Sequence, residues 1–184
     1  MEQNKEKILL HACCGICSGY PISVLKDEGY IPMVYFCNPN LDTKEEYERR
    51  LNAQQIICNN YAVDLVAEPY NHETFLNKII GLEQEPEKGR RCEVCISLRL
   101  YATAKKAKSL GITSFTTSLP ISPHKDFDMI KQIGLEAAKD YAVQFIPYNW
   151  KKQDGFLKTN KIANDLEIYR QKYCGCEFAK SHLK

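Results

Sequence analysis

The chain has 184 residues, of which 44% are hydrophobic and 26% charged, and its formal net charge is +2. This length supports one domain, expected to span residues 1–184, and excludes a small module that needs cross-links to fold. No apolar run is long enough to cross a membrane, and the first residues lack the features of a signal peptide. We therefore expect a cytoplasmic, reducing location, where nine cysteines indicate metal or redox chemistry rather than a disulfide framework.

The first predicted element is a buried strand at residues 7–13, and three cysteines, Cys13, Cys14 and Cys17, lie at its end. Adjacent side chains of a strand point to opposite faces, so packing in a core explains only one of the first two cysteines. His11 lies among apolar residues of the same strand. There we expect a hydrogen-bonded core histidine rather than a metal ligand.

Apolar and amphipathic segments alternate through the rest of the chain, which predicts strands separated by helices. The further expected strands are residues 31–37, 63–68, 113–119 and 143–148. The clearest expected helices are residues 42–61, 92–111 and 126–142. In the first helix Asp42 or Thr43 can form a capping box with Glu45 or Glu46, and Cys58 is expected to pack as a hydrophobe. The alternation favours a single α/β domain with a mostly parallel sheet flanked by helices.

The next cysteines, Cys92 and Cys95, form a C-x-x-C pair at an expected helix start, directly after Arg90 and Arg91. The helix dipole and the guanidinium groups favour the thiolate, which is the form that ligates metal or attacks an electrophile. A spacing of three puts both sulfurs on one side of the first turn. Because ligands of parallel sheets bind beyond the carboxyl ends of the strands, we expect this pair to meet the first three cysteines there.

The loop after the fourth expected strand, residues 116–126, offers several hydroxyl groups followed by His124, Lys125 and Asp126. Such a loop suits a phosphate or a sugar as ligand. Taken singly, His124 is expected to be an exposed loop histidine.

Residues 150–184 form a basic C-terminal part with eight Lys or Arg against four Asp or Glu, whereas residues 1–149 are net negative. Aromatic residues are interleaved with these charges. The pattern favours an anionic partner such as RNA, although a solvated basic face explains the charge as well. Cys174 and Cys176 flank Gly175, which lets the backbone bend so that both sulfurs face one target.

Three close groups of cysteines together indicate a metal or redox function more strongly than any single pair. Two close pairs also describe a tetrahedral zinc site, but seven clustered thiols exceed the coordination of one zinc ion. An iron–sulfur cluster takes four cysteines and leaves the others for a second iron or a redox pair. A thioredoxin-like site needs only one C-x-x-C pair.

With these motifs in place, the chain resembles the QueH-type epoxyqueuosine reductases, the cobalamin-independent family. The resemblance is carried by HACCGIC, FCNPNL, EPEKGRRCEVCISLRLYATAKKAK, FTTSLPISPHKD and YRQKYCGC, which are distributed over nearly the whole chain. It implies a fold like the adenine-nucleotide α-hydrolase (HUP-like) group, with a helical C-terminal tail that contains cysteines. It also implies reduction of the epoxide of epoxyqueuosine to queuosine at the wobble position of tRNAs with GUN anticodons, the last step of queuosine biosynthesis.

The same resemblance implies a [4Fe–4S] cluster, an adjacent mononuclear iron held by cysteines and an aspartate, and an external electron donor. The family's metal-site cysteines carry over to Cys13, Cys14, Cys17, Cys92, Cys95, Cys174 and Cys176. We expect the cluster to be held by the adjacent pair and the C-x-x-C pair, because a cluster requires ligands from two rigid elements: Cys13, Cys14, Cys92 and Cys95. The other three, Cys17, Cys174 and Cys176, remain for the second iron or a redox pair.

Two departures from the family pattern concern the iron site. The family usually has Pro where this chain has Ile16, and often Asp-Phe where it has Asn149 and Trp150. Without an aspartate at position 149, Asp126 is our substitute candidate for the iron ligand. Asp126 and His124, with Lys125 between them, are also candidate proton donors when the epoxide opens.

RNA docking is expected from the basic C-terminal part and from the arginines around the C-x-x-C pair: Arg90, Arg91 and Arg99. An aromatic side chain such as Trp150 or Tyr173 is expected to stack on an anticodon base. Two other functions stay open. One is an ATP-dependent tRNA sulfur-transfer enzyme of related fold, although residues 13–21 lack the phosphate-binding loop of such enzymes. The other is a non-catalytic zinc or iron–sulfur redox module.

Overall fold

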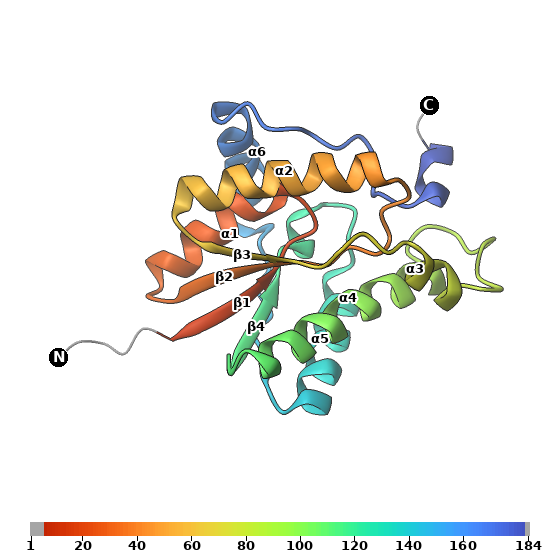
Figure 1. Cartoon of the computed structure of the whole chain (residues 1–184), viewed down its shortest axis with the longest axis horizontal. Coiled ribbons are helices and arrows are strands. Elements are labelled where there is room, and N and C mark those ends of the chain that lie inside the picture. The colour runs from red at the N-terminus through yellow and green to blue at the C-terminus, as the bar shows by residue number, and fades with distance from the viewer. Residues whose placement is uncertain (1–5, 183–184) are drawn as a thin grey trace.

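A five-stranded parallel sheet forms the centre of the computed structural model, which describes residues 6–182. The strand order is β3-β2-β1-β4-β5, and Figure 1 labels β3, β2, β1 and β4 in this order. The strands are β1 (Lys7–His11), β2 (Ile31–Phe36), β3 (Asp64–Ala67), β4 (Ser114–Thr117) and β5 (Gln144–Phe145). Each strand lies within a range predicted from the sequence, and the α/β architecture is confirmed.

Helices cover both faces of the sheet (Figure 1). The helices are α1 (Gly15–Asp27), α2 (Lys44–Tyr61), α3 (Glu73–Lys78), α4 (Arg90–Ser109), α5 (Phe127–Tyr141) and α6 (Gly155–Asp165). Short 3-10 turns complete the chain: η1 (Leu119–Ile121), η2 (Lys152–Asp154) and η3 (Glu177–His182). The first face is covered by α1, α2 and α6, and the opposite face by α4 and α5. No helix of the described residues is long and apolar enough to cross a membrane.

The central strand shows why this sequence forms a doubly covered sheet. Ile8, Leu9 and Leu10 are all fully buried. Because side chains alternate along a strand, Ile8 and Leu10 pack beneath α1 and α2, while Leu9 packs beneath α4 and α5. Burial of each side chain contributes about 1.5–3 kcal/mol, so both helical layers are held on one short strand.

The capping box is confirmed, but three helices, α1, α3 and α6, were not among the helices named from the sequence. Thr43 caps α2, and its Oγ1 accepts a hydrogen bond from the backbone N–H of Glu46 at 3.1 Å. Cys58 of the same helix is buried in the core, as predicted. One of them, α1, begins at Gly15 inside the first cysteine motif, two residues after the end of the expected strand. Two glycines and Pro21 give α1 a poor helix propensity, so packing decides its conformation.

The start of α1 lies very close to α2. A Cβ atom added at Gly15 would stand 2.6 Å from the backbone carbonyl carbon of Ala53, closer than real Cβ atoms approach backbone. The absence of a side chain at Gly15 therefore sets the spacing of the two helices and, with it, the position of the cysteines beside it.

We predict that Gly15→Ala lowers the free energy of unfolding by about 1–3 kcal/mol, because the added methyl group forces α1 away from α2. Gly19→Ala on the same helix is the matched control, since its Cβ meets only side-chain atoms of Ile162 and Ile57, the nearest at 3.0 Å. The control also gains up to about 1 kcal/mol of helix propensity. Urea unfolding of both variants measures the difference. Equal stability of the two variants would contradict the close approach.

Candidate metal centre and active-site cavity

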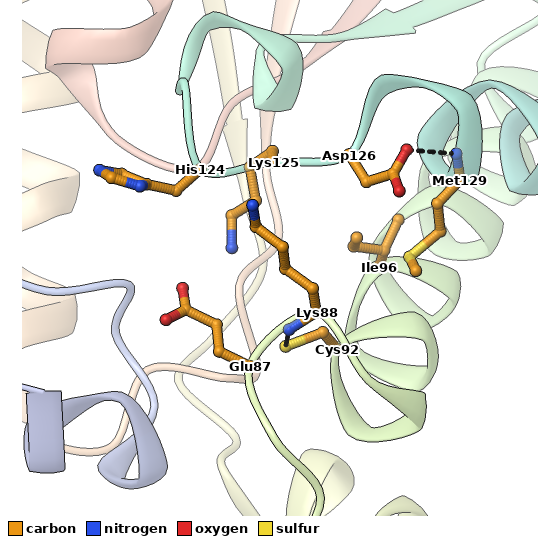
Figure 2. Close-up of a pocket in the computed structure, with 8 residues that line it drawn as sticks. All are labelled: Glu87, Lys88, Cys92, Ile96, His124, Lys125, Asp126 and Met129. Carbon is orange, nitrogen blue, oxygen red and sulfur yellow. Dashed lines mark hydrogen bonds between the residues drawn. The ribbon is translucent and has the colours of Figure 1, made fainter.

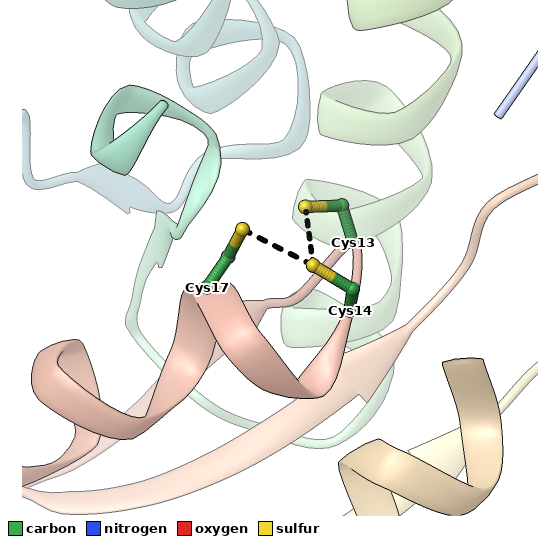
Figure 3. Close-up of side chains that lie close together, drawn as sticks. All are labelled: Cys13, Cys14 and Cys17. Atoms are coloured by element: carbon green, nitrogen blue, oxygen red, sulfur yellow. Dashed lines mark hydrogen bonds between the residues drawn. The ribbon is translucent and has the colours of Figure 1, made fainter. Parts of the chain in front are cut away.

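The carboxyl ends of β1 and β4 mark the point where the strand order of the sheet changes direction. The backbone N–H of Ser118, directly after β4, donates to the carbonyl of His11 at the end of β1, at 2.8 Å. Ligands of doubly wound sheets bind at this place. Two neighbouring groups of predicted site residues lie there, one on α4 and the loop before α5 (Figure 2) and one at the start of α1 (Figure 3).

The group at the start of α1 consists of Cys13, Cys14 and Cys17. Their Sγ atoms lie within 4.8 Å of one another, with 3.7 Å between Cys13 and Cys14 and 3.1 Å between Cys14 and Cys17. Cys14 is the N-cap of α1 and Cys17 lies in its first turn, so the spacing of three brings both sulfurs to one side (Figure 3). All three are free thiols.

This donor set fits a thiophilic metal ion or a metal–sulfur cluster. Two thiolates bound to one tetrahedral ion at about 2.3 Å lie about 3.8 Å apart, close to the separation of Cys13 and Cys14. The hydrogen bond from Cys14 lowers the pKa of Cys13, whereas burial raises the pKa of Cys14, which favours one thiolate in the group. Gln171 donates from Nε2 to the Sγ of Cys14 at 2.9 Å, a contact of the kind that tunes metal–sulfur sites.

Arg99 of α4 is a buried cation beside the sulfurs. It is 2% exposed, and its Nη2 donates to the Sγ of Cys95 at 3.3 Å while its Nε donates to the carbonyl of Cys95 at 3.1 Å. Among the ion pairs of residues 6–182, none includes Arg99. Burial alone would lower the pKa of Arg99, but the surrounding sulfurs raise it: Cys95, Cys174, Cys13 and Cys92. A buried cation needs compensating negative charge, and these sulfurs are the groups placed to supply it.

Cys174 comes from the other end of the chain and pairs with a lysine. The Nζ of Lys125, in the loop before α5, donates to the Sγ of Cys174 at 2.9 Å. Burial would raise the pKa of Cys174, yet the charges of Lys125 and Arg99 outweigh burial and lower it. Cys174 is therefore the thiol that most readily becomes a thiolate on this side of the site.

The segment around Cys174 is clamped to the start of α2. Arg50 donates to the carbonyls of Tyr173 and Cys174 at 2.9 and 3.2 Å, and the backbone N–H of Asp42 donates to the carbonyl of Gly175 at 2.9 Å. Gly175 has a φ of +118°, and a Cβ there would meet Leu41 at 2.6 Å. A glycine is thus required where the chain turns past Cys174.

A cavity of about 450 Å³ connects these groups, a size within the range of small-molecule sites. Sulfurs from both ends of the chain line it, together with basic, acidic and aromatic side chains: Cys13, Cys17, Cys174, Arg50, Arg99, Lys125, His124, Lys172, Glu87, Gln171, Tyr173 and Phe156. Cysteines that are more than 150 positions apart in the sequence therefore share one chamber, whereas Cys92 and Cys95, which were expected to meet the first three cysteines, do not line it.

The two remaining predicted cysteines lie at the edge of this arrangement. Cys92 faces a small adjoining pocket with Lys125 and Asp126, and its Sγ accepts a hydrogen bond from the backbone N–H of Lys88 at 3.3 Å (Figure 2). Cys176 packs in an apolar cluster with Phe75 and Cys95. Burial raises the pKa of Cys176 to about 11, so Cys176 and Cys174 have opposite environments despite their C-x-C spacing.

The predicted proton donors occupy different positions. His124 is exposed, as expected, and lies where the cavity and the adjoining pocket meet. Asp126 caps α5, and its Oδ1 accepts from the backbone N–H groups of Asp128 and Met129 at 3.0 and 3.1 Å (Figure 2). These capping hydrogen bonds occupy the Asp126 carboxylate at the start of the helix. Lys125, the third candidate proton donor, makes the contact to sulfur, since its Nζ donates to the Sγ of Cys174.

Three expectations about charge and stacking were wrong. Arg91 and Arg99 are buried, so they do not present their guanidinium groups to RNA phosphates. Burial raises the pKa of Cys95, and the guanidinium beside it belongs to Arg99 rather than to Arg90 or Arg91, the first two residues of α4. Trp150 is 3% exposed, and its Nε1 donates to the carbonyl of Thr117 at 2.7 Å, so it holds the end of β4 instead of stacking on a base.

The expectation for His11 is confirmed. The side chain is fully buried, and its two ring nitrogens lie 2.9 Å from the Oγ1 of Thr117 and 3.2 Å from the carbonyl oxygen of Cys37. The carbonyl only accepts, so Nε2 donates and Nδ1 accepts. Burial, together with the charge of Arg99, lowers the pKa of His11 to about 4, and the neutral ring connects the carboxyl ends of the three central strands.

Comparison with known proteins identifies the family. A family model described as Epoxyqueuosine reductase QueH matches residues 8–182. The chain is 36% identical over 184 residues to the Epoxyqueuosine reductase QueH of Streptococcus pyogenes serotype M1, covering 97% of this chain and 72% of that protein. The chain belongs to the epoxyqueuosine reductase QueH family. Its QueH relative from Thermotoga maritima is 32% identical, with 94% of this chain and 89% of that protein covered.

Solved structures of other proteins share the fold. One is a U34-tRNA thiolase NcsA from Methanococcus maripaludis with its [4Fe–4S] cluster, with a TM-score of 0.57 and 14% identity over 96% of this chain and 62% of that chain. Another is a predicted subunit of tRNA methyltransferase from Methanocaldococcus jannaschii, with a TM-score of 0.58 and 12% identity over 86% and 74% of the two chains. At such identities the likeness shows the fold alone.

Sequence reasoning missed two residues of this site and misjudged a third. Gln171 lies within the YRQKYCGC motif but was given no role there, and Arg50 lies in none of the motifs. Only the folded chain brings these two side chains to the cysteines. Arg99 lies four residues after Cys95, so the helical spacing does place it above that sulfur, but its burial depends on the packing of α4 against the sheet.

We predict that Lys125→Met raises the pKa of Cys174, because the variant removes the ammonium group that favours the thiolate. In reduced, metal-free protein, the pH profile of Cys174 alkylation, followed by peptide mass spectrometry, should shift to higher pH. Lys131→Met, at an exposed lysine of α5, is the control and should leave the profile in place. An unchanged profile in Lys125→Met would refute the ion pair.

Proposed function

We propose that this protein reduces the epoxide of epoxyqueuosine to the alkene of queuosine within tRNA, at the wobble position of GUN anticodons. The observation that carries the proposal is the cavity in which Cys13 and Cys174 meet the buried Arg99, in a member of the epoxyqueuosine reductase QueH family. The cavity lies at the carboxyl edge of the sheet, where a substrate can enter beside a sulfur-bound metal group.

The metal group in this proposal is a [4Fe–4S] cluster with an adjacent iron. When bound, such a group supplies electrons one at a time and a Lewis acid for oxygen. Cys13 and Cys14 on one side, with Cys92 and Cys95 on α4, are proposed to hold the cluster. The remaining cysteines, Cys17, Cys174 and Cys176, are proposed to hold the second iron or to form a redox pair. The buried guanidinium of Arg99 supports this assignment, since it favours an anionic sulfur centre.

The chemistry requires electrons and protons in equal number. Conversion of an epoxide to an alkene removes the oxygen as water and consumes two electrons and two protons. The electrons come from an external donor. Lys125 holds a proton on Nζ in the wall of the cavity, within hydrogen-bond distance of Cys174, and is the proposed donor to the oxygen as the carbon–oxygen bond breaks. His124 at the same wall can deliver the second proton.

The charge around the cavity suits an RNA substrate. Lys172 and His124 line it together with Lys125, and Glu87 is its one acidic side chain among the described residues. Phosphates near the modified nucleoside can therefore approach without repulsion. Binding that depends on such contacts weakens as the salt concentration rises.

We predict about four or more irons per chain, with acid-labile sulfide and a broad visible band, in protein purified without oxygen. Cys14→Ala should lose the band and the reduction of epoxyqueuosine tRNA, because the central sulfur of the group is removed. Cys58→Ala is the matched control, since Cys58 is buried in the core and bonds only to Gln54. It should keep both properties.

One zinc ion and no sulfide after anaerobic reconstitution would contradict the iron chemistry. The protein would then be a zinc-binding module rather than a reductase. Circular dichroism of each variant separates loss of metal from loss of folding.

A further inference from the structure

We propose that Phe156 is the platform on which an unpaired base of the RNA substrate stacks at the cysteine cavity. Because the RNA substrate is part of the proposed function, this assignment rests on that function and names a residue that seats the substrate. Phe156 is the second residue of α6 and lines the cavity together with Cys13, Cys17 and Cys174.

The exposure of Phe156 is unusual for an aromatic side chain in this protein. It is 43% exposed, whereas every other Phe, Tyr and Trp side chain among residues 6–182 is buried or half-buried. No ring stacking or cation contact involves it within the same residues. An aromatic ring in the wall of a charged cavity is therefore left without a partner from the protein itself.

The other aromatic candidates are already engaged. Trp150 is buried. Tyr173 lines the cavity, but its ring contacts Arg50 at 5.6 Å and Lys180 at 5.0 Å, and its hydroxyl donates to the Oδ1 of Asp42 at 2.6 Å. Of the Phe, Tyr and Trp residues that line the cavity, Phe156 alone offers a ring that no cation covers.

The backbone before Phe156 holds the ring in place. Gln153 and Asp154 have φ values of +56° and +59°, a conformation that costs free energy for residues with side chains and that persists where the surrounding structure demands it. At Gly155 a Cβ atom would collide with the carbonyl oxygen of Trp150. The turn is closed against a buried tryptophan, and Thr159 anchors the following helix by a hydrogen bond to the carbonyl of Ile16.

The surroundings of the ring match single-stranded RNA. Proteins that bind unpaired nucleotides combine an aromatic ring for the base with cations for the backbone. Lys172, Lys125 and His124 line the cavity with Phe156, and Lys158 follows two residues later on the exposed surface of α6. A purely apolar partner would not interact favourably with these cations. A base of the anticodon loop can stack on the ring while its phosphates contact the cations, and it is therefore the partner that we assign.

The test measures binding of an unmodified anticodon stem–loop RNA by fluorescence anisotropy. Phe156→Ala should weaken binding roughly 5- to 150-fold, the effect of losing one stacked base. Phe156→Leu should be nearly as weak, because it keeps apolar bulk without a ring, whereas Phe156→Tyr should bind like the wild type. Leu157→Ala is the matched control, since Leu157 is adjacent, 66% exposed and outside the cavity lining. It should bind like the wild type.

A second readout reports stacking directly. The emission of Phe156→Trp should be quenched when the RNA is added, and that of Leu157→Trp should not, with the wild type as the blank for Trp150. Wild-type affinity in Phe156→Ala overturns the assignment, as does unchanged emission of Phe156→Trp while RNA binds. Failure of the wild type to bind the RNA overturns it as well.

The outcomes also separate this assignment from the proposed function. A wild type that reduces epoxyqueuosine tRNA, with Phe156→Ala binding normally, removes Phe156 from substrate binding and leaves the function. If the wild type binds RNA through Phe156 but has no reductase activity, the assignment of Phe156 stands and the proposed function fails. Iron content per chain should be equal in all variants, because a phenylalanine side chain has no atom that ligates a metal.

Discussion

The charge of Arg99 is the constraint on which the site depends. A guanidinium group that is 2% exposed and has no carboxylate partner among the described residues costs several kcal/mol unless other groups compensate its charge. In this protein the groups around it are cysteine sulfurs. Neutral thiols compensate the charge poorly, whereas thiolates or a sulfur-bound metal group compensate it well. A buried cation in α4 therefore favours an anionic sulfur centre at the carboxyl edge of the sheet.

The rest of the fold brings the sulfurs to that cation. β1 and the first turn of α1 deliver one group, α4 carries Arg99 and Cys95, and the C-terminal segment returns across α2 to add Cys174. The return is fixed by a buried ion pair, in which Arg50 donates to Glu46 at 2.7 Å and also to the carbonyls before and at Cys174. Tyr169 donates to the same Glu46 at 2.8 Å. Charges on α2 thus position a cysteine that lies far away in the sequence.

Local signals were sufficient to predict the strands, the Thr43 cap and the cysteine groups, because each depends on the alternation or spacing of nearby residues. The helix α1 could not be predicted this way, since its glycines and proline disfavour a helix and its contact with α2 compensates. The burial of Trp150 and Arg99 could not be predicted this way either, because the residues around them come from distant elements. Cys174 and Cys176 share a motif, but their surroundings differ. Cys176 packs against α3 and α4, whereas Cys174 contacts Lys125.

The most direct measurement is anomalous diffraction at the iron edge from crystals grown without oxygen. The proposed function predicts iron within bonding distance of the Sγ atoms of Cys13 and Cys14, in the cavity beside Arg99. Iron density that is absent from this cavity, with a disulfide between Cys14 and Cys17 or a signal at the zinc edge alone, would contradict an iron-dependent reductase.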